Sequence, residues 1–339
     1  MLLGSDQPLS RVYDVAMLDL DGVVYIGSEA VFGAAHYLAE ARSAGMRCAF
    51  ITNNAARPPG AVATHLRDLG VDASEEDVVT SAQAAARVLA DRLGTGARVV
   101  LLGGPGLEAA LRERGLEPVG VEDEAEAVVS GYGPEVRWSE IMRAAVRVRG
   151  GLWWVASNTD TTIPTPFGVA PGHGVLVDAI RRFSGVEPVV AGKPARPLLD
   201  ETVRRVGGAR PLMVGDRLDT DIAGARNAEV DALLVLTGVT GLDELVAAAP
   251  GERPTFVGLD LRALNTPHPL PVRDERGWRV GDWAGRIEDG RLAIEGAGAA
   301  DDWWRTVATN AWAFLDERGD VVDTSLLTLP PRADLVDGR

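Results

Sequence analysis

The amino-acid sequence predicts an α/β protein with a doubly wound, parallel, Rossmann-like core sheet, and two observations support this prediction. Short apolar runs alternate with helical patterns through most of the 339 residues, which is typical of a parallel sheet covered by helices. Acidic, amide or glycine residues directly follow several of these runs. Ligands of doubly wound sheets bind beyond the carboxyl ends of the strands, so these residues mark the expected site.

Two separate segments, residues 1–94 and 186–264, are expected to form this core. Both contain apolar runs of strand length, and the stretches between the runs have helical patterns. The expected strands are 15–19, 47–52, 188–191, 211–214 and 232–236, and the expected helices are 34–44, a stretch after Pro59, 81–93, 197–206 and 220–227.

The middle of the chain, residues 95–185, contains a second set of similar units, with strands expected at 99–102, 127–130 and 153–156. This stretch is too long to be a loop within a compact domain. We therefore expect an inserted α/β domain.

The last segment, residues 265–339, is expected to be a small β/α appendage. It begins with a proline-rich linker. An Asp289-Gly290 pair then predicts a hairpin turn, and residues 301–316 place their apolar side chains on one helical face. Five of the eight tryptophans lie after residue 271. We expect these tryptophans to pack in a core rather than to bind a ligand.

The composition excludes several classes of protein. Acidic residues outnumber basic ones by 49 to 34, for a net charge of −15, so a nucleic-acid partner is not expected. The single cysteine, Cys48, cannot form an internal disulfide. Neither a signal peptide nor an apolar stretch of about 18 residues is evident. A soluble, cytoplasmic protein without a membrane partner is expected, and a homodimer remains open.

Two aspartates, Asp19 and Asp21, stand where the first expected strand ends, and Gly22 follows them. Their place at the carboxyl end of a strand favours a role in ligand binding or catalysis. The alternative is an ordinary turn, which aspartate and glycine also favour.

The second and third expected sites follow two other strands. Thr52, Asn53 and Asn54 offer a hydroxyl and amides that suit an oxyanion, although Thr and Asn also cap helices. Lys193 is the only lysine among 34 basic residues. An ammonium is a compact point charge that the planar guanidinium of arginine does not always replace, which makes Lys193 a candidate functional residue; the alternative is a lysine that has survived by chance.

The fourth expected site comes after the strand at 211–214, where Asp216, Asp219 and Asp221 fall within six residues. Because like charges repel, a divalent cation would stabilise such a group. The alternative is a solvated acidic helix start, which the helix dipole favours.

Together these segments resemble, in order, the four motifs of the haloacid dehalogenase superfamily of phosphatases. The middle domain resembles the large α/β cap of subclass IIA, the group of the nitrophenylphosphatases and phosphoglycolate phosphatases. The resemblance covers about residues 12–258, and the chain beyond 261 lies outside the common pattern. The segments that carry it are 19–24, 52–54, 192–194, and 215–216 with Asp221.

The resemblance implies a role for each motif. Asp19 would be the nucleophile that forms an aspartyl-phosphate, and Asp21 would be the general acid and base. Mg²⁺ would be the cofactor, because it prefers hard oxygen ligands. Its ligands would be Asp19, Asp216, the Asp21 carbonyl and, through water, Asp221, while Thr52, Asn53, Asn54 and Lys193 would bind the phosphoryl oxygens.

The substrate implied is a small phosphorylated metabolite, and the cap would select it. Asn158 and Asp160 are candidate ligands for substrate hydroxyls, with local turn bonding as the alternative. His173, between two glycines, is expected to be structural. The polar cap segment has no aromatic platform, which favours glycerol 3-phosphate over pyridoxal phosphate; 2-phosphoglycolate and nitrophenyl phosphate are further candidates.

Two rival functions remain open. Residues 104–109 match a dinucleotide-binding fingerprint, which would suit a nicotinamide-dependent oxidoreductase. No set of residues for hydride transfer accompanies this motif. The other rival is a catalytically silent binding scaffold with the same fold.

Overall fold

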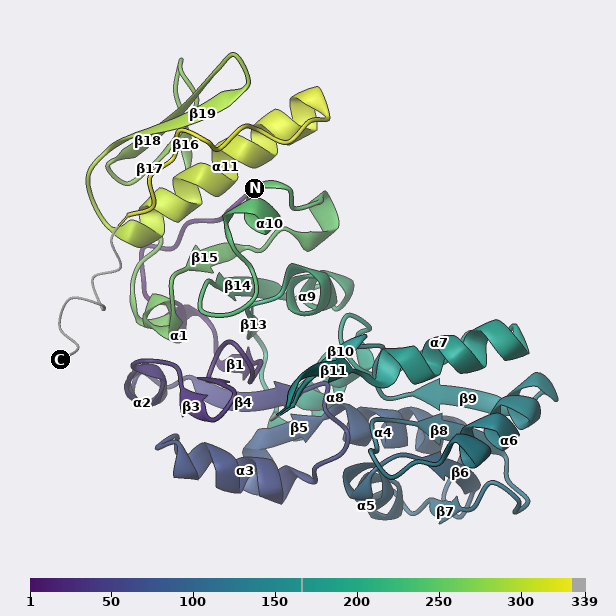
Figure 1. The fold of residues 1–339 in the computed structure, drawn as a ribbon. Helices are drawn as coiled ribbons and strands as arrows, with labels where there is room; N and C mark the ends of the chain where they lie inside the picture. The colour runs from purple at the N-terminus through teal and green to yellow at the C-terminus, as the bar shows by residue number, and fades with distance from the viewer. Residues whose placement is uncertain (166, 331–339) are drawn as a thin grey trace. The chain divides into compact units, whose positions relative to one another are not determined.

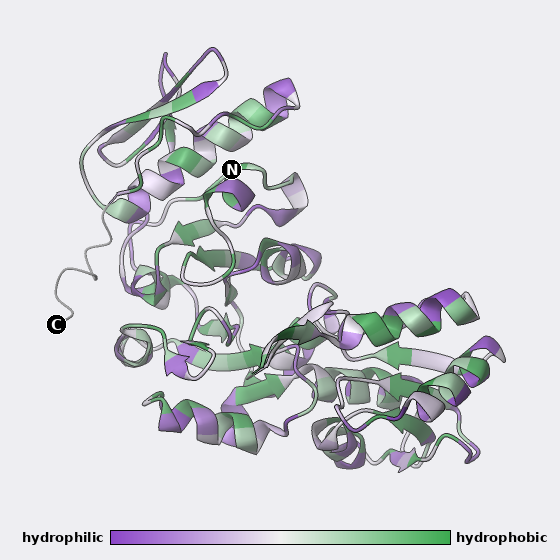
Figure 2. Ribbon diagram, viewed as in Figure 1, coloured by the Kyte–Doolittle hydropathy of each residue, from purple (hydrophilic) through white to green (hydrophobic). Residues whose placement is uncertain are grey.

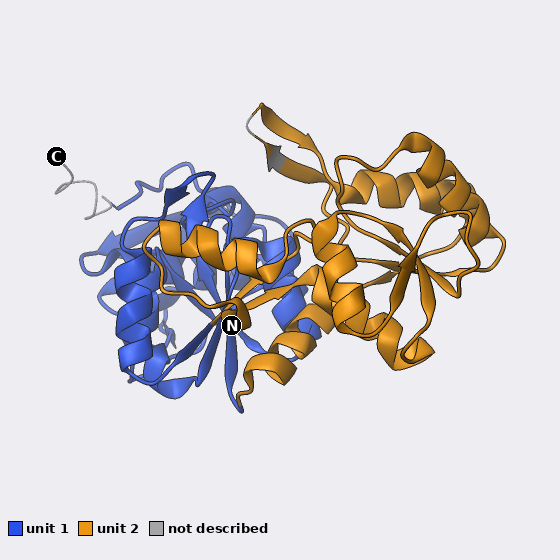
Figure 3. Cartoon of the chain, turned by 90° about the horizontal axis from the view of Figure 1, so that it is seen from below, with its two compact units in different colours: residues 1–48, 209–339 blue, residues 49–208 orange. Residues whose placement is uncertain are grey.

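The computed structural model describes residues 1–165 and 167–330, and the chain forms two compact units (Figure 3). The first unit combines residues 1–48 with the chain from 209 onward, and the second consists of residues 49–208. Segments far apart in the sequence therefore build the first unit.

The first unit contains four neighbouring parallel strands in the order β15-β14-β13-β1 (Figure 1). Their side chains are almost all buried, and β14 and β15 are largely green in Figure 2. This confirms the strands expected at 15–19, 211–214 and 232–236. The bounds are β1 Val15–Leu18, β13 Pro211–Gly215, β14 Asp231–Val235 and β15 Phe256–Gly258.

Short helices and turns connect these strands. The helix expected at 34–44 is confirmed as α2, whereas the one expected at 220–227 is a π-helical turn that leads into α9. The bounds are α1 Leu9–Val12, α2 Ala34–Ser43, the π turn Leu218–Ile222, α9 Ala223–Asn227 and α10 Leu242–Val246, with a small ribbon of β2 Tyr25–Ile26 and β3 Glu29–Ala30.

A four-stranded antiparallel sheet and one long helix, α11 (Ala300–Arg318), form the C-terminal part of the first unit. The predicted hairpin turn is confirmed: Asp289 and Gly290 have φ of 49° and 77°, and consecutive positive φ values characterise a type I′ turn. The strands are β16 Val272–Arg273, β17 Trp278–Val280, β18 Trp283–Glu288 and β19 Arg291–Gly296.

Helix α11 also packs on the strand-and-helix layer that contains β15 and α10. The Trp312 indole N–H donates to the Leu245 carbonyl at 2.7 Å. The guanidinium of Arg253 makes two hydrogen bonds, of 2.7 and 2.8 Å, to the Asp316 carboxylate. Trp312 is therefore a core residue at this junction, as expected for the C-terminal tryptophans.

The second unit is built around a five-stranded sheet in the order β12-β9-β8-β6-β7, with parallel neighbours. Trp154 is almost fully buried in its core. The strands expected at 99–102, 127–130 and 153–156 are thereby confirmed. Their bounds are β6 Arg98–Leu102, β7 Glu117–Val119, β8 Ala127–Ser130, β9 Trp153–Ala156 and β12 Val189–Val190.

The remaining elements of this unit are its helices, a hairpin and two further strands. The helices expected at 81–93 and 197–206 have those bounds in the structure. A hairpin follows β9, and a parallel pair, β4 with β5, precedes α4. The bounds are β4 Arg47–Thr52, α3 Pro59–Asp68, β5 Val78–Thr80, α4 Ser81–Leu93, α5 Pro105–Glu113, α6 Trp138–Arg149, β10 Thr162–Thr165, β11 Gly168–Pro171, α7 His173–Ser184 and α8 Pro197–Val206.

Among the described residues, we find no helix with the length and apolar character needed to cross a membrane. The fold is the expected α/β arrangement of parallel sheets and helices.

Candidate active site

Three carboxylates converge at the carboxyl ends of β1 and β13 in the first unit. One oxygen from each of Asp19, Asp216 and Asp221 lies within 4.8 Å of the others. The parallel pairing of β1 with β13 explains part of this arrangement: the Asp19 N–H donates to the Val214 carbonyl at 2.8 Å. Asp216 and Asp221 are both fully buried.

Glycines make room for these carboxylates. A Cβ atom on Gly238 would lie 2.0 Å from Asp216 Oδ2, and one on Gly22 would lie 2.4 Å from the same oxygen. Gly22 also has a φ of +85°, a conformation that favours glycine. At Gly215, a Cβ would lie 2.2 Å from the Cβ of Asp221. A side chain at any of these positions would displace a carboxylate of the cluster.

Backbone N–H groups hold the two buried carboxylates in place. The Val239 N–H donates to Asp216 Oδ2 at 2.7 Å. Asp221 Oδ2 accepts from the N–H groups of Asp216 and Arg217, both at 3.1 Å. This contact depends on the π-helical turn, which directs Asp221 back toward the end of β13.

The acidic motif is divided by this turn. Asp219 is exposed and pairs with the Arg217 guanidinium at 2.7 Å, so it does not take part in the cluster. Sequence spacing alone did not separate Asp219 from Asp221.

The cluster suits a Mg²⁺ ion. Its donors are hard carboxylate oxygens, which Mg²⁺ prefers, and three carboxylates held this close repel one another without a cation. The glycines and backbone N–H groups fix the carboxylates in spite of that repulsion. Asp19, Asp216 and Asp221 would hold the ion.

Asp21 lies beyond the end of β1, in a tight turn in which the Gly22 N–H donates to the Tyr25 carbonyl at 2.7 Å. The residue as a whole is exposed. Desolvation of its carboxyl group nevertheless raises the pKa of Asp21, and a hydrogen bond from the Gly27 backbone opposes this effect. A carboxyl group with a raised pKa is suited to donate a proton.

In the second unit, the end of β4 is a compact polar turn. Thr52 Oγ1 accepts from the Asn54 N–H at 3.0 Å, and Asn54 Oδ1 accepts from the Ala56 N–H at 2.9 Å. Both side chains thus bond to the nearby backbone, but neither caps a helix as the alternative had it, because α3 begins at Pro59 with Pro58 as its N-cap residue. The Asn53 side chain is directed instead to the segment that contains Lys193, whose side chain is buried.

The two cap candidates join the same polar group. Asn158 Nδ2 donates to the Asn53 carbonyl at 2.7 Å, and Asn158 Oδ1 accepts from the Asp160 N–H at 3.1 Å. The carboxylate of Asp160 accepts from Asn53 Nδ2 at 3.1 Å. His173 Nδ1 donates to the Asn158 carbonyl at 2.9 Å, and burial lowers the pKa of His173 to about 4. The structure thus brings together Asn53, Asn158, Asp160 and Lys193.

Several residues of these two groups were missed from the sequence. Gly238, Val239 and Thr240 lie against Asp216. The Thr240 hydroxyl donates to the backbone carbonyl of Asp216 at 2.6 Å. Ser81 donates to the Asn53 carbonyl at 2.5 Å. A signal was available for Gly238, because this glycine lies two residues after the end of a predicted strand, at the expected edge of the sheet.

The dinucleotide-like motif is explained by packing. A Cβ on Gly106 would lie 2.6 Å from the Ala55 carbonyl oxygen and 2.7 Å from that of Arg57. The Gly106 N–H donates to the Ala56 carbonyl at 2.9 Å. The glycine therefore allows the start of α5 to contact the chain after β4, and the oxidoreductase hypothesis has no support in the structure.

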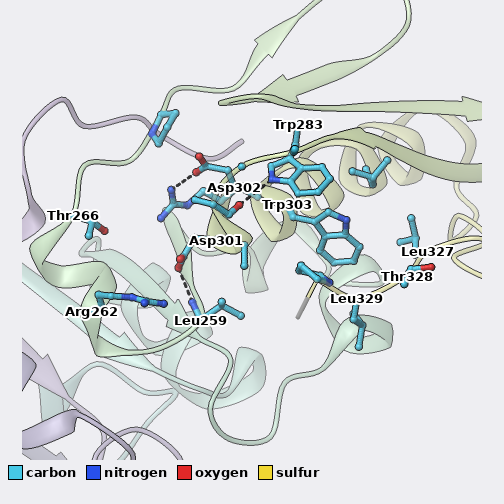
Figure 4. A pocket seen from close by; sticks show the side chains of 18 of the residues that line it. Leu259, Arg262, Thr266, Trp283, Asp301, Asp302, Trp303, Leu327, Thr328 and Leu329 are labelled. Atoms are coloured by element: carbon cyan, nitrogen blue, oxygen red, sulfur yellow. Dashed lines mark hydrogen bonds and ion pairs between the residues drawn. The ribbon is translucent and has the colours of Figure 1, made fainter. Parts of the chain in front are cut away.

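A separate cavity of about 930 Å³ lies at the start of α11 (Figure 4). Trp283 and Trp303 form part of its wall, and its charged groups have partners within the unit. Asp301 accepts from the Leu259 N–H at 2.8 Å, and Asp302 pairs with Arg305 at 2.7 Å. The three-carboxylate cluster is not part of this lining.

Comparison with protein families identifies two matching models. Residues 16–117 match a model described as a haloacid dehalogenase-like hydrolase, and residues 190–264 match a related hydrolase-like model. Together they span both segments in which the four motifs lie.

Two curated relatives are phosphatases. A D-glycerol 3-phosphate phosphatase of Mycobacterium tuberculosis is 44% identical over 82% of this chain and 79% of its own length. An acid sugar phosphatase of Staphylococcus saprophyticus is 34% identical over 73% of this chain and 96% of its own.

Solved structures agree with these relatives. A glycerol phosphate phosphatase from M. tuberculosis in complex with calcium has a TM-score of 0.83 and 39% identity, covering 95% of this chain and 94% of its own. A magnesium complex of a glycerol phosphate phosphatase from that organism has a TM-score of 0.82. A 4-nitrophenylphosphatase from Thermotoga maritima has a TM-score of 0.70 and 30% identity, and the match covers 76% of this chain and 98% of its own. The coverage of 95% is high enough to include much of the C-terminal part.

Proposed function

Because the chain belongs to the haloacid dehalogenase-like hydrolases and is a Mg²⁺-dependent phosphatase, we propose that its substrate is a small phosphomonoester, with glycerol 3-phosphate favoured. The observation that supports this most strongly is the cluster of Asp19, Asp216 and Asp221. A relative that is 44% identical and carries the name D-glycerol 3-phosphate phosphatase supports the choice of substrate.

In the proposed first step, an Asp19 carboxylate oxygen attacks phosphorus. A bond forms between that oxygen and phosphorus, and the bond from phosphorus to the substrate oxygen breaks. Asp21 donates a proton to the leaving alkoxide, a role that its raised pKa suits. The products are a free alcohol and an aspartyl-phosphate on Asp19.

In the second step, Asp21 takes a proton from water, and the water oxygen attacks phosphorus. Inorganic phosphate leaves and the Asp19 carboxylate is restored. When bound, Mg²⁺ neutralises negative charge on the carboxylates and on the phosphoryl group.

Phosphate binding is assigned to the end of β4 and to the segment after β12. Lys193 provides a positive charge for the phosphoryl oxygens, and the Thr52–Asn54 turn provides hydroxyl and backbone donors. Since the Asn158 side chain is already bonded to two backbone groups and a neighbouring hydroxyl, Asp160 is the stronger cap candidate. A carboxylate has two oxygens, so Asp160 can accept from a substrate hydroxyl and retain its bond to Asn53.

We also propose the domain division expected from the sequence: a core of residues 1–94 and 186–264, a substrate-selecting cap of 95–185, and an appendage of 265–339. We place the reaction in the cytoplasm, in keeping with a single, buried cysteine at Cys48.

A phosphate-release screen tests the proposed function. The panel contains D- and L-glycerol 3-phosphate, 2-phosphoglycolate, pyridoxal phosphate and nitrophenyl phosphate, each with Mg²⁺ and with EDTA. We expect the highest kcat/KM for a glycerol 3-phosphate enantiomer and no turnover with EDTA. A substantially higher kcat/KM for pyridoxal phosphate would overturn the substrate assignment, and activity undiminished by EDTA would overturn the role of the metal.

A further inference from the structure

The side chain of Asn53 connects two segments that lie far apart in the sequence. Its Oδ1 accepts from the Lys193 N–H at 2.8 Å, and its Nδ2 donates to the Lys193 carbonyl at 3.0 Å. The second Nδ2 hydrogen is directed to Asp160 Oδ1 at 3.1 Å. Lys193 is 140 residues from Asn53, and Asp160 is 107 residues from it.

The orientation of this amide follows from its partners. Lys193 N–H requires an acceptor, whereas the Lys193 carbonyl and the Asp160 carboxylate require donors, so oxygen and nitrogen can be assigned in only one way. A peptide bonded at both its N–H and its C=O is fixed in position and in orientation. Asparagine provides the donor and the acceptor together, which neither aspartate nor alanine can do.

The backbone of Asn53 is equally constrained. Its carbonyl accepts from the Ser81 hydroxyl at 2.5 Å and from Asn158 Nδ2 at 2.7 Å. A Cβ on Gly192 would lie 2.6 Å from Asn53 Oδ1, so the glycine before Lys193 allows the close approach. Asn53 itself is 8% exposed. Its amide is therefore held within the unit rather than presented to solvent.

We propose that Asn53 is a positioning residue that holds the Lys193 backbone and the Asp160 carboxylate in a fixed relation to each other. This inference rests on the proposed function, in which Lys193 binds the phosphoryl group and Asp160 binds the rest of the substrate. It differs from the role expected from the sequence, in which Asn53 binds phosphate. Because its side-chain donors and acceptor are already bonded, Asn53 acts through the two residues that it holds.

Whether Asn53 fixes the Lys193 backbone can be tested without substrate. Hydrogen–deuterium exchange of the peptide containing Lys193 is measured for the wild type, Asn53→Ala and Ser81→Ala. Ser81→Ala is the matched control, since it removes a hydrogen bond from the Asn53 carbonyl and leaves the side-chain amide intact. We expect exchange at the Lys193 N–H to be at least about tenfold faster in Asn53→Ala than in Ser81→Ala, because that N–H loses its acceptor.

The functional part is tested by kinetics. With D-glycerol 3-phosphate, we expect Asn53→Ala to raise the inhibition constant of inorganic phosphate at least about tenfold, which reports on Lys193. The kcat/KM of Asn53→Ala, Asp160→Ala and the double variant should be non-additive by at least about fivefold, since both single changes break the same hydrogen bond. Asp160→Asn retains a carbonyl acceptor for Asn53 Nδ2. The non-additivity of kcat/KM between Asp160→Asn and Asn53→Ala should therefore be smaller than that between Asp160→Ala and Asn53→Ala.

The outcomes are separable. Unchanged exchange at Lys193 in Asn53→Ala overturns the positioning role, whether or not the protein is a phosphatase. Faster exchange with an unchanged phosphate inhibition constant and additive kcat/KM effects also overturns it, because Asn53 would then contribute to stability only. A wild-type protein that releases no phosphate from any substrate overturns the proposed function, and the exchange experiment still decides whether Asn53 fixes Lys193. Should Asn53→Ala fail to fold, Asn53→Asp provides the second variant; it keeps the acceptor for the Lys193 N–H and loses both donors.

Discussion

The two polar groups of this protein are built on opposite electrostatic principles. In the first unit, Asp19, Asp216 and Asp221 place like charges within 4.8 Å of one another, and glycines and backbone N–H groups hold them there. In the second unit, Asn53 is a neutral amide whose partners include the Lys193 backbone, and the bonds are satisfied without any ligand. The three carboxylates of the first group suit a cation, whereas the Asn53 amide has its donors and its acceptor bonded within the chain. Charge changes in the first group should therefore act on metal binding, and changes at Asn53 should act through the residues that it holds.

The largest expected effect is that of Asp19→Asn. The amide is nearly isosteric with the carboxylate but is a poor nucleophile, so kcat should fall by at least about a thousandfold. Because one of three clustered charges is removed, thermal stability should be equal to or higher than that of the wild type. Steady-state kinetics and thermal denaturation measure both quantities. Activity within tenfold of the wild type, in a preparation free of wild-type enzyme, would rule out Asp19 as the nucleophile.

Metal binding should separate the aspartates that lie close together in sequence. In the wild type, saturating Mg²⁺ should raise the thermal midpoint, since a ligand that binds only the folded state stabilises it. We expect Asp216→Asn to abolish both the Mg²⁺-induced increase in the thermal midpoint and the turnover of substrate, because Asp216 is a buried member of the cluster. Asp219→Asn is the matched control: Asp219 pairs with Arg217 outside the cluster, so the Mg²⁺-induced increase should remain. If both variants lost the increase equally, the cluster would be wrongly delimited.

The second unit should respond to pH through His173. Burial lowers the pKa of His173 to about 4, compared with about 6.5 in an unfolded chain. The unfolded state therefore takes up the proton first, and stability falls as the pH decreases from about 6.5 toward 4, by up to about 3 kcal/mol. Urea denaturation of the wild type and His173→Gln at several pH values tests this. The stability advantage of the wild type should shrink with acidification; an advantage that stays constant between pH 7 and 4.5 would contradict the assignment.

The smallest expected effect concerns a contact that belongs to neither group. Trp312→Phe keeps an aromatic ring in the core and removes the N–H that donates to the Leu245 carbonyl. We expect a loss of about 1 to 2 kcal/mol in the free energy of unfolding, with kcat within about twofold of the wild type. Denaturant unfolding and kinetics on the same preparation check both values. A loss of kcat of a hundredfold would show that α11 affects the chemistry, which the comparison above does not predict.

Most of the fold could be predicted because its elements have local signals. The strand at 47–52 contains a continuous apolar run at 48–51, and helix 81–93 has a capping box in which Thr80 and Gln83 bond to each other's backbone. In contrast, β15 has only three residues, too few for a periodic pattern. The division of 220–227 into a π turn and a helix also has no simple sequence pattern.

The site was predictable in its residue types and less so in its partners. The acidic motif indicated a cation, but only the π turn determines that Asp221, and not Asp219, faces Asp216. The role of Asn53 depends on groups 107 and 140 residues away. Such contacts arise from tertiary packing, which a local pattern in one sequence does not encode.

The single lysine has a practical consequence for labelling this protein. Lys193 carries the one side-chain primary amine of the sequence. This lysine is 2% exposed. Amine-selective dyes or surface-coupling reagents should therefore leave the side chains of the native protein unlabelled. A label on the Lys193 side chain would report that the interior around it had opened to the reagent.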